Sequence, residues 1–198
     1  AGLLAIACVA TEVTQEAVRR QDALPVAAAA LGYGVAGARL MGALLKVQQR
    51  VAIKVEANGP LEKMVVESDS YGHVRGYVSQ PAVPAVLPID QELVADAVGR
   101  LGLLTVVKDV GMQQLYEGVV PLQTGVLDKD LMYYLAQSEQ ILSLMELGVT
   151  QDGQGKLVAV GGFLLHAMPS YDVAVLARLV ERSEDLPPVE SLLAEGRT

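Results

Sequence analysis

The most constraining feature of this sequence is its longest uncharged stretch, which runs from Ala23 to Ala38 and is closed by Arg39. Pro25 suits the first turn of a helix, and the alanines at positions 27–30 have the highest helix propensity of any residue type. A helix that is apolar on almost every side is enclosed by other layers of the fold. The stretch is shorter than the roughly 20 apolar residues of a membrane-spanning helix, so we expect a buried helix and no membrane segment.

The residues around this helix predict antiparallel strands joined by short turns. After Arg50 apolar and polar residues alternate, which is typical of a half-buried strand. Turns at residues 58–60, 71–72 and 151–155 separate such strands, and three prolines between positions 81 and 88 predict an extended loop. Strands are expected at residues 3–9, 51–57, 63–68, 73–79, 103–108, 116–122, 142–149 and 157–166, and helices at 11–21, 25–45, 128–138, 172–183 and 189–195.

Charge and cysteine content exclude several classes of protein. The 198 residues carry 15 Lys and Arg against 23 Asp and Glu, a formal net charge of −8, whereas a nucleic-acid-binding surface needs clustered positive charge. Cys8 is the one cysteine, which rules out an internal disulfide framework and fits a reducing compartment. With 52% hydrophobic residues, a chain of this length can form one domain with a full core and needs no metal or disulfide to fold.

One literal motif suggests a nucleotide site. Gly32-Tyr33-Gly34-Val35-Ala36-Gly37 reads G-x-G-x-x-G, and the acidic Glu56 follows about 20 residues later, as in dinucleotide-binding folds. That mechanism needs a strand immediately before the glycines, so that a tight turn aims amides at a pyrophosphate. Here the preceding residues favour a helix, so the competing interpretation is that the glycines let other backbones approach a buried helix. A dinucleotide-binding oxidoreductase therefore stays as the alternative function.

Other candidate catalytic or metal-binding residues do not form a recognisable constellation. Cys8, His73 and His166 are not arranged in the closely spaced pairs that are typical of a zinc site. No G-x-S-x-G nucleophile motif is present, and Asp128 and Asp130 lie where the N-terminus of a helix favours negative charge. We therefore expect a protein that is not an enzyme and has no native metal site within these residues.

Taken together, the ordered blocks along the chain resemble the core of the redox-regulated 33 kDa heat-shock chaperone (33 kDa chaperonin) family. The resemblance covers nearly all of the chain, and the order and spacing of the blocks make it highly specific. The blocks are Glu56-Ala57-Asn58-Gly59-Pro60-Leu61, Val74-Arg75-Gly76-Tyr77-Val78, Val98-Gly99-Arg100-Leu101-Gly102-Leu103, Tyr116-Glu117-Gly118-Val119-Val120-Pro121-Leu122, Asp130-Leu131-Met132-Tyr133-Tyr134, Ser138-Glu139-Gln140, Gly161-Gly162-Phe163-Leu164 and Leu186-Pro187-Pro188-Val189.

This resemblance implies a fold class and a division of the chain. The fold is α+β, with layered sheets that enclose a buried helix and with a C-terminal helical linker segment. Residues 1–170 would form the chaperone core domain, and residues 171–198 would begin the helical linker to a redox-switch zinc domain. In the full-length family one zinc is held by four C-terminal cysteines that this sequence does not contain, and Cys8 matches none of them. No cofactor is therefore expected in this chain.

The resemblance also implies an ATP-independent holdase that binds unfolding proteins, here called clients, and prevents their aggregation. The family is activated by oxidation; without the zinc switch, this stretch of chain is expected to bind clients constitutively. A homodimer formed by strand exchange and a location in the bacterial cytoplasm, or in an organelle such as a chloroplast or mitochondrion, are further implications. Besides the oxidoreductase, a third hypothesis is an assembly module whose apolar surface serves dimerisation alone.

Candidate client-binding residues follow from the need for an exposed apolar surface. They lie in the proline-rich loop and in the C-terminal tail: Val83, Val86, Leu87, Leu192 and Leu193. The competing interpretation is that these side chains pack against the chain's own core or linker.

Overall fold

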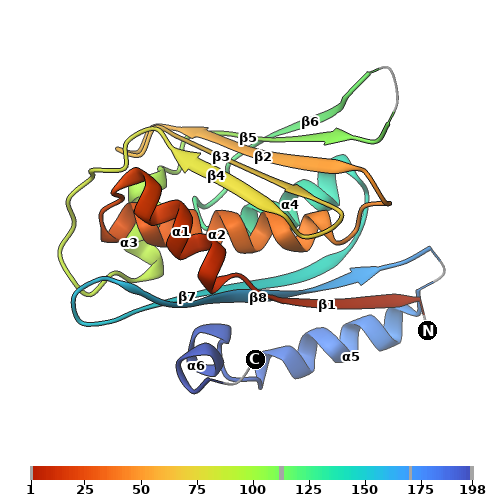
Figure 1. The fold of residues 1–198 in the computed structure, drawn as a ribbon. Coiled ribbons are helices and arrows are strands. Elements are labelled where there is room, and N and C mark those ends of the chain that lie inside the picture. Colours follow the sequence, from red (N-terminus) through yellow and green to blue (C-terminus); the bar gives the residue numbers. More distant parts are fainter. Residues whose placement is uncertain (1, 112–113, 170, 197–198) are drawn as a thin grey trace.

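The computed structural model describes residues 2–111, 114–169 and 171–196, and it contains two antiparallel sheets with a helix enclosed between them (Figure 1). We call the sheets A and B. Sheet A has three strands in the order β1 (Leu3–Val9), β8 (Leu157–Ala167) and β7 (Ser143–Gln151). Sheet B has five, in the order β4 (Val74–Val78), β3 (Lys63–Asp69), β2 (Arg50–Ala57), β5 (Gly102–Asp109) and β6 (Tyr116–Pro121). The expected α+β class with layered sheets is confirmed.

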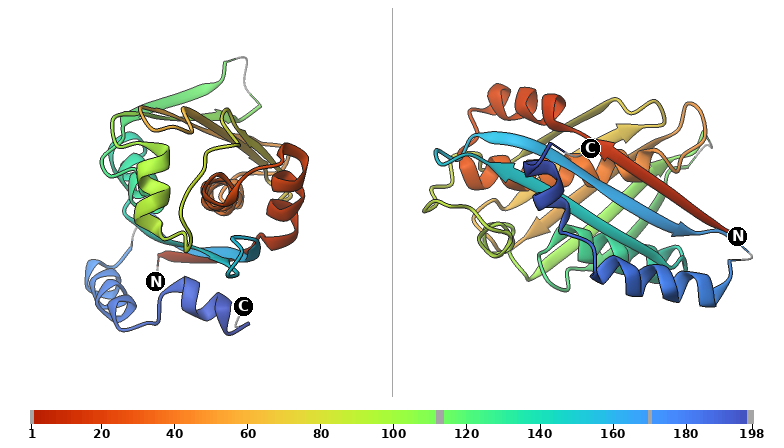
Figure 2. Two further views of the ribbon diagram at one scale, coloured as in Figure 1. Left: turned by 90° about the vertical axis from the view of Figure 1, so that its left-hand side faces the viewer. Right: turned by 90° about the horizontal axis from the view of Figure 1, so that it is seen from below.

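The enclosed helix is α2 (Pro25–Gly42), and its burial confirms the prediction from the uncharged stretch. Every residue from 26 to 38 is buried, and Leu31, Ala36 and Leu40 are completely so. The helix ends at Gly42 rather than at residue 45, and Gly42 packs so closely on sheet B that an added Cβ would lie 2.6 Å from the Oγ of Ser68. Figure 2 shows the helix end-on, between the two sheets.

Sheet B is held on α2 by the alternation that the sequence predicts. In β2, Val51, Ile53 and Val55 are buried, while the residues between them are half-buried. Ile53 lies opposite Val66 of β3 and Val106 of β5, so one face of the sheet forms a continuous apolar layer. The outward residues are largely polar, as expected for an antiparallel sheet with one solvated face.

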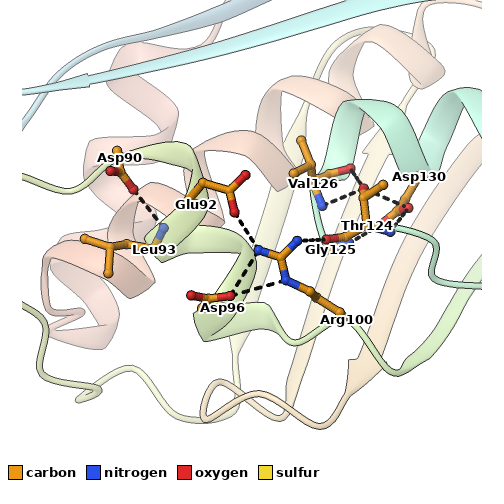
Figure 3. A network of polar contacts seen from close by, with 9 residues as sticks. All are labelled: Asp90, Glu92, Leu93, Asp96, Arg100, Thr124, Gly125, Val126 and Asp130. Atoms are coloured by element: carbon orange, nitrogen blue, oxygen red, sulfur yellow. Dashed lines mark hydrogen bonds and ion pairs between the residues drawn. The ribbon is translucent and has the colours of Figure 1, made fainter.

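Helix α3 (Gln91–Val98) was not predicted from the sequence, although its start carries a recognisable signal. Asp90 is its N-cap, and its carboxylate accepts a hydrogen bond of 2.8 Å from the backbone N–H of Leu93. Arg100 follows the helix and pairs with Glu92 (2.6 Å) and Asp96 (3.1 Å), as Figure 3 shows. Asp90 is therefore a helix N-cap signal in the sequence, although the preceding prolines favoured a loop over this region.

The same Arg100 connects α3 to the loop before α4 (Leu127–Ser138), because it donates a hydrogen bond of 3.1 Å to the carbonyl oxygen of Thr124. That loop is organised by the buried carboxylate of Asp130, which accepts from the backbone N–H groups of residues 123, 124 and 125. Figure 3 shows Asp130 beside Thr124 and Gly125. The helix begins at Leu127, one residue before the predicted start at residue 128. Val126 is the N-cap, and the carboxylate of Asp128 accepts from the N–H groups of Lys129 and Leu147.

Three other helices complete the fold. Helix α1 (Thr11–Gln21) has the predicted bounds and contacts both α2 and β8. Helices α5 (Val173–Glu184) and α6 (Val189–Ala194) lie outside sheet A, on the face turned away from α2 (Figures 1 and 2). Asp172 caps α5 by accepting from the N–H of Ala174 at 2.8 Å. The boundary predicted at residue 170 and the chain ends, residues 1 and 197–198, lie outside the described residues.

Candidate functional site

Over β1 and β8 the outer face of sheet A is apolar, where a solvated sheet face is normally polar. In β1 and β8 the side chains that point away from α2 carry no charge, and we call them together the outer sheet face. This follows from the register, because the side chains of Cys8 and Leu164 point inward and those of successive residues alternate. The outer sheet face comprises Leu3, Ala5, Ala7, Val9, Gly161, Phe163, Leu165 and Ala167.

Helix α6 covers one end of this face and is seated by apolar contacts. Val189 and Leu193 are each only 7% exposed. They lie over glycines of sheet A: an added Cβ at Gly148 would be 2.7 Å from Val189 Cγ1, and one at Gly161 would be 3.3 Å from Leu193 Cδ2. The glycines thus form a depression that admits the helix. The α6 part of the tail is therefore packed against sheet A.

Two polar contacts also hold α6 in its position on sheet A. Glu146 of β7 accepts a hydrogen bond of 2.7 Å from the backbone N–H of Val189, so its carboxylate lies at the positive end of the helix. The hydroxyl of Tyr33, in the buried α2, donates to the carboxylate of Glu190. Burial and the neighbouring Glu190 carboxylate raise the pKa of Tyr33, so the phenol stays protonated and remains a donor. These contacts join α6 to both the sheet and the core helix.

Helix α5 is less closely seated than α6. A groove of about 510 Å³ separates it from the sheet and is lined from the sheet side by Ala5, Phe163 and Leu165 and from the helix side by Leu179. A second groove of about 320 Å³ lies beside α6 and is lined by Val9, Leu192 and Leu193 among others. Ala7 and Phe163 line both grooves, so the apolar surface continues along β1 and β8 from one helix to the other.

The structure places the five predicted client-binding residues in two separate regions. In the proline-rich loop Val83 packs against the core, whereas Val86 is 81% exposed and Leu87 is 38% exposed. In α6, Leu192 lines a groove and Leu193 is buried against sheet A. The five predicted residues therefore do not form one continuous surface.

Sequence reasoning missed the residues that do form a continuous apolar surface, those of β1 and β8. A signal was present: residues 3–9 read Leu-Leu-Ala-Ile-Ala-Cys-Val and lack the polar alternation expected of a strand with one solvated face. Such a pattern also fits a strand that is covered on both faces, but Ala5, Ala7 and Val9 on the outer face are exposed in the structure.

The G-x-G-x-x-G motif does not form a nucleotide site. Gly32, Gly34 and Gly37 lie inside α2, which follows another helix rather than a strand, and all three are buried. An added Cβ on Gly32 would lie 2.9 Å from Val149, and one on Gly34 would lie 2.8 Å from the Met64 sulfur. The glycines therefore let strands of both sheets approach the helix. The dinucleotide alternative is wrong, because no tight turn presents amides to a pyrophosphate.

The remaining candidate residues do not converge on a reactive site. Burial raises the pKa of the Cys8 thiol to about 11, partly offset by the nearby Arg39, so the thiolate is scarce at neutral pH. His73 is exposed and its Nδ1 lies 2.9 Å from the carboxylate of Asp69. His166 is buried, and its Nδ1 has no hydrogen-bond partner among the described residues.

Across the described ranges, no group of His, Cys, Asp and Glu side chains is placed to hold a metal ion. In the same part of the chain, none of the helices is both long and apolar enough to cross a membrane.

Comparison with known proteins identifies the family. The family model described as Hsp33 protein matches residues 2–198. The 33 kDa chaperonin of Geobacter sulfurreducens is 47% identical over 195 residues, which cover 98% of this chain and 64% of that protein. The 33 kDa chaperonin of Geobacter sp. strain M21 is 46% identical over 192 residues, with coverages of 97% and 65%.

A solved structure gives the same result. The crystal structure of the 33 kDa chaperonin from Thermotoga maritima matches with a TM-score of 0.89 and 32% identity, covering 98% of this chain and 67% of that chain. The chain spans about 65% of the length of the curated relatives that it matches. The ordered sequence blocks, the enclosed helix and these matches agree, and the chain belongs to the Hsp33 family.

Proposed function

We propose that this protein is an ATP-independent holdase, which binds unfolding client proteins through apolar surface and prevents their aggregation without catalysing a reaction. The observation that supports this most directly is the uncharged outer sheet face with its two grooves. Transfer of the apolar side chains of a non-native client from water to this surface lowers the free energy. A large apolar surface can bind clients in this way without recognising a particular sequence. The names of the related 33 kDa chaperonins support the same class of activity.

The proposed client-binding surface combines the outer sheet face with residues of the loop and of α6. Val86 and Leu87 are exposed and available in the structure as it stands. Leu192 and Leu193 would become available together with the depression over Gly148 and Gly161 when α6 moves away. A helix of six residues that buries two large apolar side chains is a small unit, so its release costs far less than unfolding the core.

We further propose that residues 1–198 bind clients without oxidation. Cys8 is the one cysteine in the sequence, and its thiol is buried with a raised pKa of about 11, so it is poorly suited to sensing oxidants. The apolar grooves are open with the thiol reduced. In full-length members of the family, the zinc held by four C-terminal cysteines would provide the redox control that the resemblance implies.

The division of the chain, its assembly and its location are also proposals. Residues 1–170 would act as the core and residues 171–198 as the beginning of a linker, which the position of α5 and α6 outside sheet A supports. A homodimer formed by strand exchange is part of the same proposal. The bacterial cytoplasm is the proposed location, because the relatives named above are bacterial proteins.

Light scattering from a chemically unfolded client diluted into buffer with the reduced chain, in the absence of ATP, tests the proposal. We expect suppression of aggregation near an equimolar ratio. Unchanged aggregation would contradict holdase activity of these residues, and would leave dimerisation as the use of the apolar surface. Activity that appears only after oxidant is added would contradict constitutive binding while retaining the holdase.

A further inference from the structure

Strand β1 presents a free edge at the border of sheet A. Among the described strands it pairs with β8 alone. At its two ends the N–H of Ala10 donates to the carbonyl of Val160 (2.8 Å), and the carbonyl of Gly2 accepts from Met168 (2.7 Å). Hydrogen-bonded and non-hydrogen-bonded pairs alternate along an antiparallel ladder, so the even-numbered residues of β1 bond to β8. The backbone N–H and C=O groups of Leu3, Ala5 and Ala7 therefore point toward the free edge.

This edge lacks the features that normally prevent a strand from pairing further. Native edge strands carry charged residues, prolines or bulges. The sequence from Leu3 to Val9 contains no charge and no proline, and its pairing with β8 is regular. The outer strands of sheet B differ, because β4 carries the exposed Arg75 and β6 carries Glu117 and Pro121.

Side chains beside the free edge leave room for those of another strand. The outward residues of β1 are small, since Ala5 lies opposite Leu165 and Ala7 lies opposite Phe163. Both alanines are exposed and both line the groove under α5. A strand added next to β1 would place alternate side chains on the outer sheet face. At one end Arg39 already donates to the carbonyl of Val9 at 2.9 Å, which limits the edge to the segment before that residue.

We propose that β1 captures clients by β-augmentation, with an extended, uncharged segment of the non-native polypeptide pairing as a fourth strand of sheet A. The inference rests on the proposed holdase function and names how that surface holds its client. Main-chain hydrogen bonds recognise any extended segment, while the apolar outer sheet face selects segments with apolar side chains on alternate positions. A second copy of this chain is the competing occupant of the edge, and the hydrogen-exchange measurement described below distinguishes it from a client.

The single cysteine provides a precise test. A synthetic peptide of residues 1–7, activated as a thioester, can be ligated to a fragment that begins at Cys8, and the product refolded. N-methylation of Ala5 and Ala7 in the peptide removes two edge N–H groups, while all side chains and the hydrogen bonds to β8 remain. The control is the same ligated protein without methyl groups, and circular dichroism verifies that both proteins fold.

Binding of fluorescently labelled, reduced and carboxymethylated lactalbumin is then measured by anisotropy. We expect the methylated protein to bind about tenfold more weakly, because two hydrogen bonds are lost. Equal affinities would overturn capture at the edge and leave the holdase function intact. If the unmethylated control does not bind, the holdase function and the edge proposal both fail.

Hydrogen exchange of the unmodified protein gives a second measurement that does not depend on refolding. Saturation with the same lactalbumin should slow exchange of the Ala5 and Ala7 amides by about tenfold or more, since both would become hydrogen-bonded. Unchanged exchange would overturn the proposal. Protection that rises with protein concentration in the absence of client would assign the edge to a second copy, and would equally overturn client capture.

Discussion

His166 shows how one buried side chain can make the stability of this fold depend on pH. It lies on the inner face of β8, directly opposite Ser143 of β7, and the Ser143 hydroxyl also has no partner among the described residues. The charged groups that face it are Glu139 after α4 and Lys108 of β5, which form an ion pair that Tyr134 joins by donating to Glu139 at 2.9 Å. The ring therefore borders a polar cluster without being bonded to it.

Burial lowers the pKa of His166 below its usual value of 6.5; the Glu139 carboxylate opposes this and Lys108 adds to it. The unfolded chain therefore takes up a proton at a pH where the folded chain does not. The free energy of unfolding should decrease as the pH falls below about 6.5, until the folded histidine also titrates. Urea unfolding of the wild type and of His166→Gln at pH about 7.5 and about 5.5 measures this contribution.

In that comparison, the decrease between the two pH values should be smaller for His166→Gln than for the wild type. The exposed His73 supplies the matched control, since His73→Gln removes an imidazole that is not buried. An identical decrease in the wild type and in His166→Gln would exclude a contribution from His166.

At the scale of elements, the packing of α6 on sheet A can be tested by removing a single hydrogen bond. Tyr33→Phe removes the hydroxyl that donates to Glu190 and keeps the ring in the core. A hydrogen bond to a charged group is worth about 1.5–3 kcal/mol, so α6 should open more often and its amides should exchange about tenfold faster. Hydrogen exchange over residues 189–194 measures the change.

Tyr71→Phe is the matched control for this experiment, because Tyr71 is 60% exposed and lies in the turn after β3. If α6 covers part of the client-binding surface, Tyr33→Phe should also suppress aggregation at a lower protein concentration than the wild type. Exchange that is as slow in Tyr33→Phe as in the wild type would show that the apolar contacts alone hold the helix.

The proline-rich loop is a second element with a separate prediction. Replacing Val86→Asp and Leu87→Asp together adds two negative charges to exposed apolar positions, so client affinity should fall while the melting temperature changes little. The binding and melting experiments on the same sample check both statements. Unchanged client affinity in the folded double variant would remove the loop from the client-binding surface.

At the scale of the whole molecule, the net charge of −8 and the uncharged outer sheet face predict different responses to salt. Electrostatic binding weakens as ionic strength rises, whereas apolar binding does not. Affinity for reduced, carboxymethylated lactalbumin should therefore stay constant or increase between about 0.05 M and about 0.5 M NaCl. A loss of affinity over that range would indicate that charge, rather than apolar surface, holds the client.

Some features of the fold follow from local sequence patterns alone. The uncharged stretch after Ala23 determines that α2 is buried, because no orientation of such a helix gives it a solvent-facing side. Alternation in residues 50–57 likewise determines which face of β2 points inward. The start of α3 was also readable at Asp90, although the prolines before it favoured a loop.

Only the tertiary structure decided what lies on the outside of sheet A. The pattern in β1 is equally consistent with a strand covered on both faces, and the choice depends on β8 and the C-terminal helices, about 150 residues further along the chain. The depression over Gly148 and Gly161 and the donation from Tyr33 to Glu190 join distant segments in the same way. Periodicity is a local property that specifies which residues are apolar, whereas the neighbours that cover them are set by packing between segments remote in sequence.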